Sequence, residues 1–213
     1  MEYLLTALVS YLMGSFPTGP IVTRLFRGVD VRDYGSGNTG ATNVLRVMGP
    51  LGFILVFLGD FLKGLAPVVL AGALFQGPFI EVVAGLFALA GHNWSVFLRF
   101  GGGKGVVTGV AALFGISPPV GAVVTIVTVV IILASRYVSL GSLVGASVAL
   151  VGLCVSVALG VDRPEHLLYA VPGALIVISR HRENIIRLIK GTERRLGERA
   201  LPRARAAAPP GAA

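Results

Sequence analysis

The chain has few charged residues and a single cysteine, and both shortages exclude classes of protein. Charged residues make up 13% of the 213 residues, against roughly 25% in a soluble domain. Cys154 stands alone in an apolar run, so an intrachain disulfide is excluded and no metal cluster is visible. The net charge of +8 does not indicate nucleic-acid binding, because no basic patch is interleaved with aromatic residues. Hydrophobic residues at 54% and a mean hydropathy of +0.83 indicate a membrane protein.

The apolar runs predict an all-α, polytopic integral membrane protein with seven transmembrane helices, some of them short. Three spans are shorter than the roughly 20 residues that a perpendicular helix needs, and 106–116 alone resembles a re-entrant helix. The amino end lacks the basic region of a signal peptide, so the first run is expected to be a retained span. The predicted spans are 3–24, 51–75, 79–98, 106–116, 118–134, 142–160 and 164–179.

The distribution of Lys and Arg favours a crossing at 106–116. With this crossing, sixteen of the 18 lie on one side, Arg163 alone lies on the other, and Lys63 lies within a span. Without it, Arg136 and the carboxyl-terminal cations would lie outside, against the positive-inside tendency. We therefore predict an outside amino terminus, a cytoplasmic carboxyl terminus, a transmembrane domain over 1–192, and a basic, Ala/Pro-rich, disordered tail over 193–213.

Three polar segments end these spans on the predicted cytoplasmic side. They are rich in glycine, side-chain amides and fixed cations, which together suit a phosphate site. Such a site facing one membrane surface suggests an enzyme that joins a soluble phosphate compound to a lipid. The segments are Gly35–Asn43 with Arg46, Gly101–Gly105 around Lys104, and Arg180–Asn184 around His181.

Each segment also has a plainer interpretation. Ser and Asn before a helix often only cap it, and Gly101–Gly105 could be a flexible loop. It is not a nucleotide P-loop, because Leu98 and Gly105 stand where that motif needs Gly and Ser or Thr. His181 is either a general base or one interfacial residue in a basic segment.

Further polar residues lie close to these segments in the predicted topology. Asp60 and Lys63 share a helix face at i, i+3, so they either pair with each other or Lys63 reaches the site. His92 and Asn93 favour a structural role between helices. Arg136, Ser139 and Ser142 form a fourth polar cluster that could complete a phosphate shell.

The chain resembles the bacterial acyl-phosphate:glycerol-3-phosphate acyltransferases of the PlsY type over nearly its whole length. One departure is Ser95, where the family is expected to carry proline, and it bears on helix shape. The matching segments are Ser36–Asn43 with Arg46; Gly91–Trp94 through Phe97 and then Gly102–Gly105; His181–Ile185 with Arg187; and Asp60, Lys63-Gly64 and Arg136–Leu140.

This resemblance implies a reaction, a location and a set of partners. An acyl phosphate would donate its acyl chain to the 1-hydroxyl of sn-glycerol 3-phosphate, giving lysophosphatidic acid and inorganic phosphate, the first acylation of phospholipid synthesis. The expected location is the bacterial cytoplasmic (inner) membrane, with the site facing the cytoplasm. No cofactor or metal is expected, because an acyl phosphate already has a good leaving group. The soluble enzyme that supplies acyl phosphate is a candidate partner, and nucleic acid is not.

The roles of the residues remain hypotheses at this stage. Direct transfer is favoured over an acylated Ser36, since no His or Asp beside Ser36 marks a triad. His181 is the candidate base, unless a substrate phosphate takes the proton. We expect phosphate contacts from Lys104, Arg46, Ser36, Thr42, Gly102, Gly103, Ser142 and Lys63, and positioning of glycerol 3-phosphate by Asn38, Asn43 and Asn184.

Two other classes of function compete with this interpretation. An anion transporter usually binds near the midplane at broken helices, often with inverted repeats, whereas this chain places its polar groups at one face and shows no repeat. A non-catalytic lipid-binding protein would not need His181 and Lys104 together.

Overall fold

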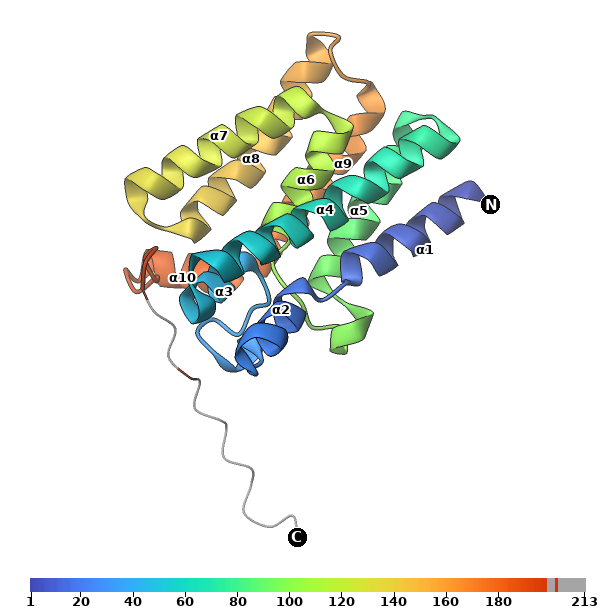
Figure 1. Ribbon diagram of the computed structural model, residues 1–213. Coiled ribbons are helices and arrows are strands. Elements are labelled where there is room, and N and C mark those ends of the chain that lie inside the picture. The colour runs from blue at the N-terminus through green and yellow to red at the C-terminus, as the bar shows by residue number, and fades with distance from the viewer. Residues whose placement is uncertain (199–201, 203–213) are drawn as a thin grey trace.

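This computed structural model describes residues 1–198 and 202, which form α-helices joined by short loops (Figure 1). Three short 3-10 turns, η1 (Val31–Asp33), η2 (Val96–Leu98) and η3 (Pro164–His166), lie in the connections. The helices are α1 (Glu2–Ser15), α2 (Thr18–Arg27), α3 (Ala41–Met48), α4 (Pro50–Phe75), α5 (Pro78–Asn93), α6 (Val106–Ile116), α7 (Pro118–Ser135), α8 (Val138–Ala158), α9 (Leu167–Arg180) and α10 (Arg182–Ile189).

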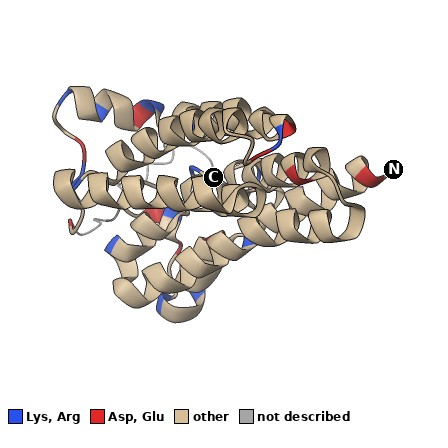
Figure 2. Cartoon of the chain, turned by 90° about the horizontal axis from the view of Figure 1, so that it is seen from above, with Lys and Arg blue, Asp and Glu red and all other residues tan. Residues whose placement is uncertain are grey.

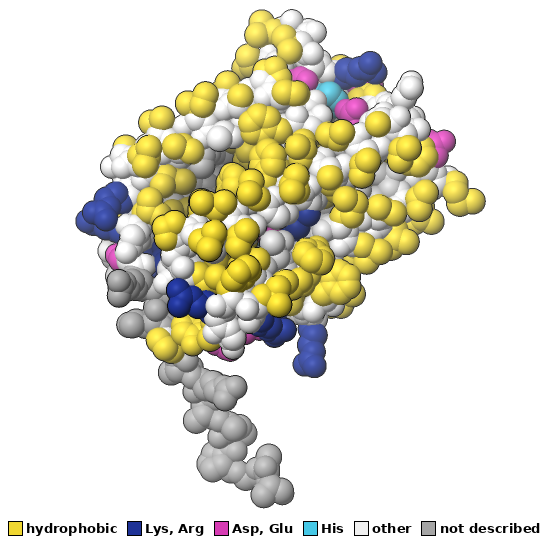
Figure 3. Space-filling view, viewed as in Figure 1, with side chains coloured by type: hydrophobic (Ala, Val, Ile, Leu, Met, Phe, Trp, Pro, Cys, Tyr) yellow, Lys and Arg dark blue, Asp and Glu magenta, His cyan; other side chains and the backbone are white. Residues whose placement is uncertain are grey.

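Within the described residues, four segments are long and apolar enough to cross a membrane: Glu2–Arg27, Pro50–Phe75, Pro118–Ser135 and Val138–Ala158. Large apolar side chains stand exposed on α4 and α7, and Figure 3 shows hydrophobic side chains spread over most of this face of the bundle. Charged residues lie mostly at helix ends and in connections (Figure 2). Such an apolar outer surface is suited to contact with lipid and not with water. The prediction of an all-helical, polytopic membrane protein is therefore confirmed.

Proline sets several of the helix boundaries. The predicted span 3–24 corresponds to the apolar segment Glu2–Arg27, which is divided into α1 and α2 at Phe16-Pro17. Proline has no N–H and pushes the residue before it out of the helical region, and Phe16 accordingly has ψ 121°. Pro118 and Pro119 likewise separate α6 from α7, since proline suits the first turn of a helix.

Other span edges differ from the prediction by a few residues. The run 79–98 is helical only to Asn93 and then turns back through η2. The last span begins with η3, so α9 itself starts at Leu167. The helix at 106–116 has the predicted bounds.

Small residues let the helices approach closely. Gly14 of α1 faces the backbone of Ala88 on α5, and Gly64 of α4 faces the carbonyl of Thr108 on α6, leaving no room for a methyl group at either glycine. Membrane helices pack in this way because lipid tails supply no hydrophobic drive between them. The buried core that results joins α4, α5, α6, α7, α8 and α9.

Helix α6 connects two opposite ends of the bundle. It begins two residues after Lys104, and Ser117 follows its last residue; the Ser117 hydroxyl donates to Asp162 in the α8–η3 connection at 2.5 Å. At 11 residues and ~1.5 Å per residue, α6 is only about 16 Å long. The end that carries Lys104 is therefore recessed into the bundle, about half the thickness of a hydrocarbon core from the other end.

Candidate active site

One cavity of about 690 Å³ lies at the Lys104 end of the bundle. Nine of the twelve predicted site residues line it, from four segments that are far apart in the sequence. The cavity thus brings the three polar segments together, while their individual roles stay predictions. The nine are Ser36, Asn38, Thr42, Asn43, Arg46, Lys104, Ser142, His181 and Asn184.

The rest of the cavity is an apolar slot between α4, α6 and α7. Phe53, Phe57 and Phe61 stack along α4 with ring centroids 5.7 and 6.1 Å apart, and Phe114 of α6 packs against Phe61 at 5.9 Å. Val129 and Leu133 of α7 line the slot and are also exposed on the outer face. An alkyl chain could therefore enter the slot from the lipid side.

The Gly35–Asn43 segment is organised by Asn43 from within. The Asn43 side chain accepts the Ser36 N–H at 3.2 Å and donates to the carbonyls of Val31, Tyr34 and Asn38, each at 3.0 Å. Its donors and its acceptor are thus already in use. Asn43 therefore shapes the loop that presents Ser36 and Asn38, and its contact with glycerol 3-phosphate stays a prediction.

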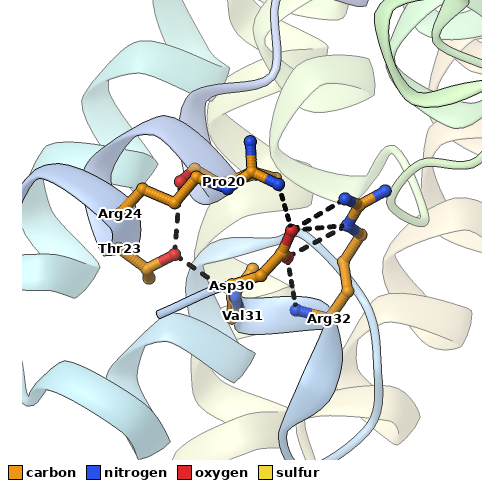
Figure 4. A network of polar contacts seen from close by, with 6 residues as sticks. All are labelled: Pro20, Thr23, Arg24, Asp30, Val31 and Arg32. Atoms are coloured by element: carbon orange, nitrogen blue, oxygen red, sulfur yellow. Dashed lines mark hydrogen bonds and ion pairs between the residues drawn. The ribbon is translucent and has the colours of Figure 1, made fainter. Parts of the chain in front are cut away.

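A charged network anchors the start of this loop to α2 (Figure 4). Asp30 accepts from Arg24 and Arg32 at 2.7 Å, and Thr23 accepts the Val31 N–H at 3.3 Å. Hydrogen bonding from Arg32 lowers the pKa of Asp30 to about 2, so the carboxylate stays charged. The loop is therefore held at both ends, by Asp30 and by Asn43.

The Gly101–Gly105 loop packs tightly onto the end of α5. A methyl group at Gly102 would overlap the carbonyls of His92 and Asn93, and one at Gly103 would overlap the His92 ring. The Gly103 N–H already donates to the His92 carbonyl at 3.1 Å, and the Gly103 carbonyl accepts from Arg180 at 3.1 Å. Gly102 and Gly103 thus have a packing role that places Lys104, and neither lines the cavity, while their phosphate contacts stay predictions.

Lys104 reaches α10 through its ammonium. Its Nζ donates to Oδ1 of Asn184, and Nδ2 of Asn184 donates to Glu193 at 2.6 Å. Burial lowers the pKa of Lys104 to about 8, while the negative charge of Glu193 opposes that fall. At neutral pH most of the lysine is still an ammonium, in a polar pocket where an anion could meet it.

His181 is held in one tautomer at the junction of α9 and α10. Its Nδ1 lies 2.8 Å from the Val177 carbonyl, which can only accept, so Nδ1 carries the hydrogen and Nε2 is left as an acceptor. The residue is only 2% exposed and lines the cavity. Burial, followed by the charge of Lys104, lowers the pKa of His181 to about 4. The imidazole is therefore neutral near pH 7 and a weak base.

Lys63 lies behind the cavity, contrary to its predicted phosphate contact. Its Nζ pairs with Asp60 at 2.7 Å and donates at 2.9 Å to the carbonyl of Phe16, which lies at the break between α1 and α2 and also accepts the Thr18 N–H. His92 lies 3.8 Å from the same carboxylate. The plainer alternative, mutual pairing of Asp60 and Lys63, is the one that the structure has.

The residues of the fourth cluster have separate roles. Ser142 lines the cavity and donates to the Val138 carbonyl of its own helix at 2.9 Å. Ser139 donates to Glu193 at 3.0 Å, and the Arg136 guanidinium donates to the carbonyl of Leu196 at 3.1 Å. The predicted tail from 193 onward thus has its first residues, through Glu198, folded against the site. Residues 199–201 and 203–213 lie outside the described part.

Two features of the site were not predicted from the sequence. The phenylalanine row of the apolar slot had a signal, the i, i+4 spacing of Phe53, Phe57 and Phe61. Glu193 had none, because a lone carboxylate after the last helix looks like part of a solvated tail.

The bundle and its cavity define a class of protein. It is an integral membrane protein with a cavity that holds cations and amides at one end and an apolar slot at the other. Such a cavity can take an anionic group and an alkyl chain side by side.

Comparisons with known proteins place the chain within this class. Residues 4–191 match the family described as glycerol-3-phosphate acyltransferase. A glycerol-3-phosphate acyltransferase of Rubrobacter xylanophilus is 46% identical over 94% of this chain and 98% of its own length. Glycerol-3-phosphate acyltransferase 2 of Moorella thermoacetica is 44% identical over 93% of this chain and 100% of its own.

A solved structure is similar as well. The crystal structure of PlsY, an integral membrane glycerol 3-phosphate acyltransferase, in its glycerol 3-phosphate form has a TM-score of 0.86 and 39% identity, covering 92% of this chain and 96% of that one. Its lysophosphatidic acid form has a TM-score of 0.84. The chain belongs to the glycerol-3-phosphate acyltransferase family of the PlsY type.

Proposed function

We propose that this protein transfers an acyl group from an acyl phosphate to the 1-hydroxyl of sn-glycerol 3-phosphate, giving lysophosphatidic acid and inorganic phosphate. The observation that carries the proposal is that the cationic pocket and the apolar slot are one cavity. Family membership and the glycerol 3-phosphate and lysophosphatidic acid forms of the similar PlsY structure support it.

The reaction needs two phosphate groups near one reacting carbon. The glycerol hydroxyl oxygen attacks the acyl carbon, the bond from that carbon to the phosphate oxygen breaks, and the hydroxyl proton goes to a phosphate oxygen. Lys104 and Arg46 hold the phosphates, and Ser36 adds a neutral donor. Most of the rate then comes from holding the two substrates in a reactive arrangement.

His181 orients a substrate in this scheme and is not the main base. Its neutral Nε2 can accept a hydrogen bond from a glycerol hydroxyl, since Nδ1 is fixed on Val177. A pKa of about 4 makes it a poor proton acceptor near pH 7. A dianionic substrate phosphate beside the hydroxyl is the stronger base.

We further propose that seven helical segments cross the membrane, with α1 outside at its start and the site facing the cytoplasm of a bacterium. The positive-inside distribution of Lys and Arg supports this orientation. The short α6 supports a site recessed below the cytoplasmic surface, within reach of a lipid-bound acyl chain.

An assay of the purified protein tests the proposed function. A 16-carbon acyl phosphate with glycerol 3-phosphate should give lysophosphatidic acid and phosphate in equal amounts, with a chelator present. The matching acyl-CoA should give little product. Comparable turnover with acyl-CoA, or turnover that needs an added divalent ion, would contradict the proposal.

A further inference from the structure

Residues 191–198, here called the C-terminal strap, fold back over the polar end of the cavity. The Leu196 N–H donates to the Arg136 carbonyl at 2.7 Å, and Arg195 lies over the Tyr137 ring at 5.7 Å. Glu193, Arg194 and Leu196 all line the cavity. The strap is thus tied to the α7–α8 connection, while its Glu193 reaches the site.

Glu193 is the most engaged residue of the strap. Its carboxylate accepts from Asn184 at 2.6 Å, from Arg187 at 2.7 Å and from Ser139 at 3.0 Å. The side chain is only 7% exposed. Charge-assisted bonds of this kind are about twice as strong as neutral ones, so Glu193 ties α8, α10 and the strap together at one point.

This carboxylate decides which way the Asn184 amide faces. A carboxylate only accepts, so the amide must turn its NH₂ toward Glu193. Its oxygen then points the other way and receives the Lys104 ammonium. With the amide reversed, Lys104 would meet an NH₂ group and lose its partner.

We propose that Glu193 is a positioning residue that acts through Asn184 to hold the Lys104 ammonium at the substrate phosphate. The inference rests on the proposed function for its catalytic meaning. The contact chain from Glu193 through Asn184 to Lys104 is independent of it. The family match ends at residue 191, so that match does not include Glu193.

The charges around Lys104 explain why Glu193 matters electrically. After burial, Glu193 has the largest influence on the Lys104 pKa and raises it; Glu183 raises it as well, and Arg187 and Arg46 lower it. Without the Glu193 charge the ammonium would face mainly other cations. The remaining titratable residues around the same cavity are Asp60 of α4, His92 of α5, His181 and Arg194.

The first experiment follows the Lys104 amine and needs no turnover. The rate at which an amine reagent modifies Lys104 is measured against pH by peptide mass spectrometry, for the wild type, Glu193→Gln and the matched control Glu198→Gln. Glu198 is an exposed carboxylate of the same strap. Glu193→Gln should lower the pH of half-maximal reactivity by about one unit, since nearby opposite charges shift a pKa by that much or more. An unchanged midpoint, or an equal shift in Glu198→Gln, would overturn the inference.

The second experiment connects this shift to turnover. In Glu193→Gln, the KM for glycerol 3-phosphate should begin to rise at a pH about one unit lower than in the wild type. Glu193→Asp, which keeps the charge, should restore most of the wild-type profile. A uniform loss of rate with an unshifted profile in Glu193→Gln would mean a merely structural role.

The two proposals can fail separately. If the wild-type protein had no acyl transfer activity, the proposed function would be contradicted. The amine titration would still test whether Glu193 positions Lys104. Normal wild-type turnover with unshifted titrations in Glu193→Gln would remove only the role of Glu193.

Discussion

Both ends of the bundle carry a buried polar cluster, but only one cluster is open. At the Lys104 end, Lys104, Arg46 and Nε2 of His181 face a cavity. At the other end, Asp162 accepts from Ser117 and Ser156 at 2.5 Å and lies 3.3 Å from His166, which in turn lies 3.5 Å from Glu81. The charged groups of the second cluster are turned toward one another.

The two clusters thus differ in function: one has polar groups that are open to a ligand, and the other has polar groups that hold helices together. The Asp162 cluster joins the α6–α7 junction, α8 and η3, and its acceptors are used within the protein. In the Lys104 cluster, cationic side chains outnumber carboxylates, and their hydrogen-bond donors face the cavity. A buried carboxylate alone therefore does not mark a site, whereas a buried cation facing a cavity suits an anion.

The largest expected difference between the two ends is their access to a reagent that cannot cross the membrane. In a Cys154→Ala background, cysteines at Gly101 or Arg182 should resist an impermeant thiol reagent in intact bacterial cells and react once the membrane is opened. A cysteine at Arg163, at the other end, should react in intact cells. All three positions are exposed. Labelling of Arg182→Cys but not Gly101→Cys in intact cells would show that α6 does not cross.

Loss of Lys104 should have the largest effect on turnover. Lys104→Ala should lower kcat/KM by about 10²-fold or more, because a preorganised charge on the reacting phosphate is removed. Lys104→Arg should also be slow, since a forked cation does not replace a point charge. The unfolding temperature should stay close to that of the wild type. Near-normal turnover of the alanine variant would refute the phosphate role of this loop.

The activity should also fall at alkaline pH through Lys104. Its pKa of about 8 means that the ammonium is lost as pH rises through that value. The KM for glycerol 3-phosphate should therefore rise above about pH 8 and stay nearly constant below it down to pH 7. An unchanged KM at pH 9 would show that the charge of Lys104 does not matter for binding.

His181 should have a smaller effect, and mainly on binding. His181→Ala should weaken the apparent affinity for glycerol 3-phosphate by up to roughly tenfold, the cost of about one neutral hydrogen bond to a glycerol hydroxyl. A rate limb near pH 6 should persist, because a substrate phosphate titrates there and the His181 pKa is about 4. Unchanged affinity together with a flattened profile would instead identify His181 as the base.

The smallest effect on turnover is expected from the closed cluster. Asp162→Asn should cost about 1–3 kcal/mol of stability through weakened charged hydrogen bonds, with kcat/KM unchanged well below the unfolding temperature. Burial raises the Asp162 pKa, but bonds from Ser117, Ser156 and His166 outweigh it and leave the pKa below its ordinary value of 3.8. This stability is therefore present above pH 4 and lost as pH falls below it. A tenfold loss of turnover in Asp162→Asn would contradict the purely structural role of the Asp162 cluster.

The sequence by itself determined the class of fold and most of the polar residues that line the cavity. Apolar runs this long predict a helical membrane protein, because in lipid a single segment can form all its backbone hydrogen bonds internally only as a helix. Polar residues confined to one side of those runs, Lys104 and His181 among them, had to meet near one surface. These properties are local or periodic, and so they can be read along the chain.

Tertiary structure alone decided what each polar residue does. Asn43 and Asn184 are the same residue type in similar contexts, yet the first is used up inside its loop and the second links Lys104 to Glu193. Lys63 turns to the Phe16 carbonyl, 47 residues away, and away from the cavity. A side chain bonds to whichever partner packing brings within about 3 Å, and that distance is set by contacts between helices that spacing along the chain does not encode.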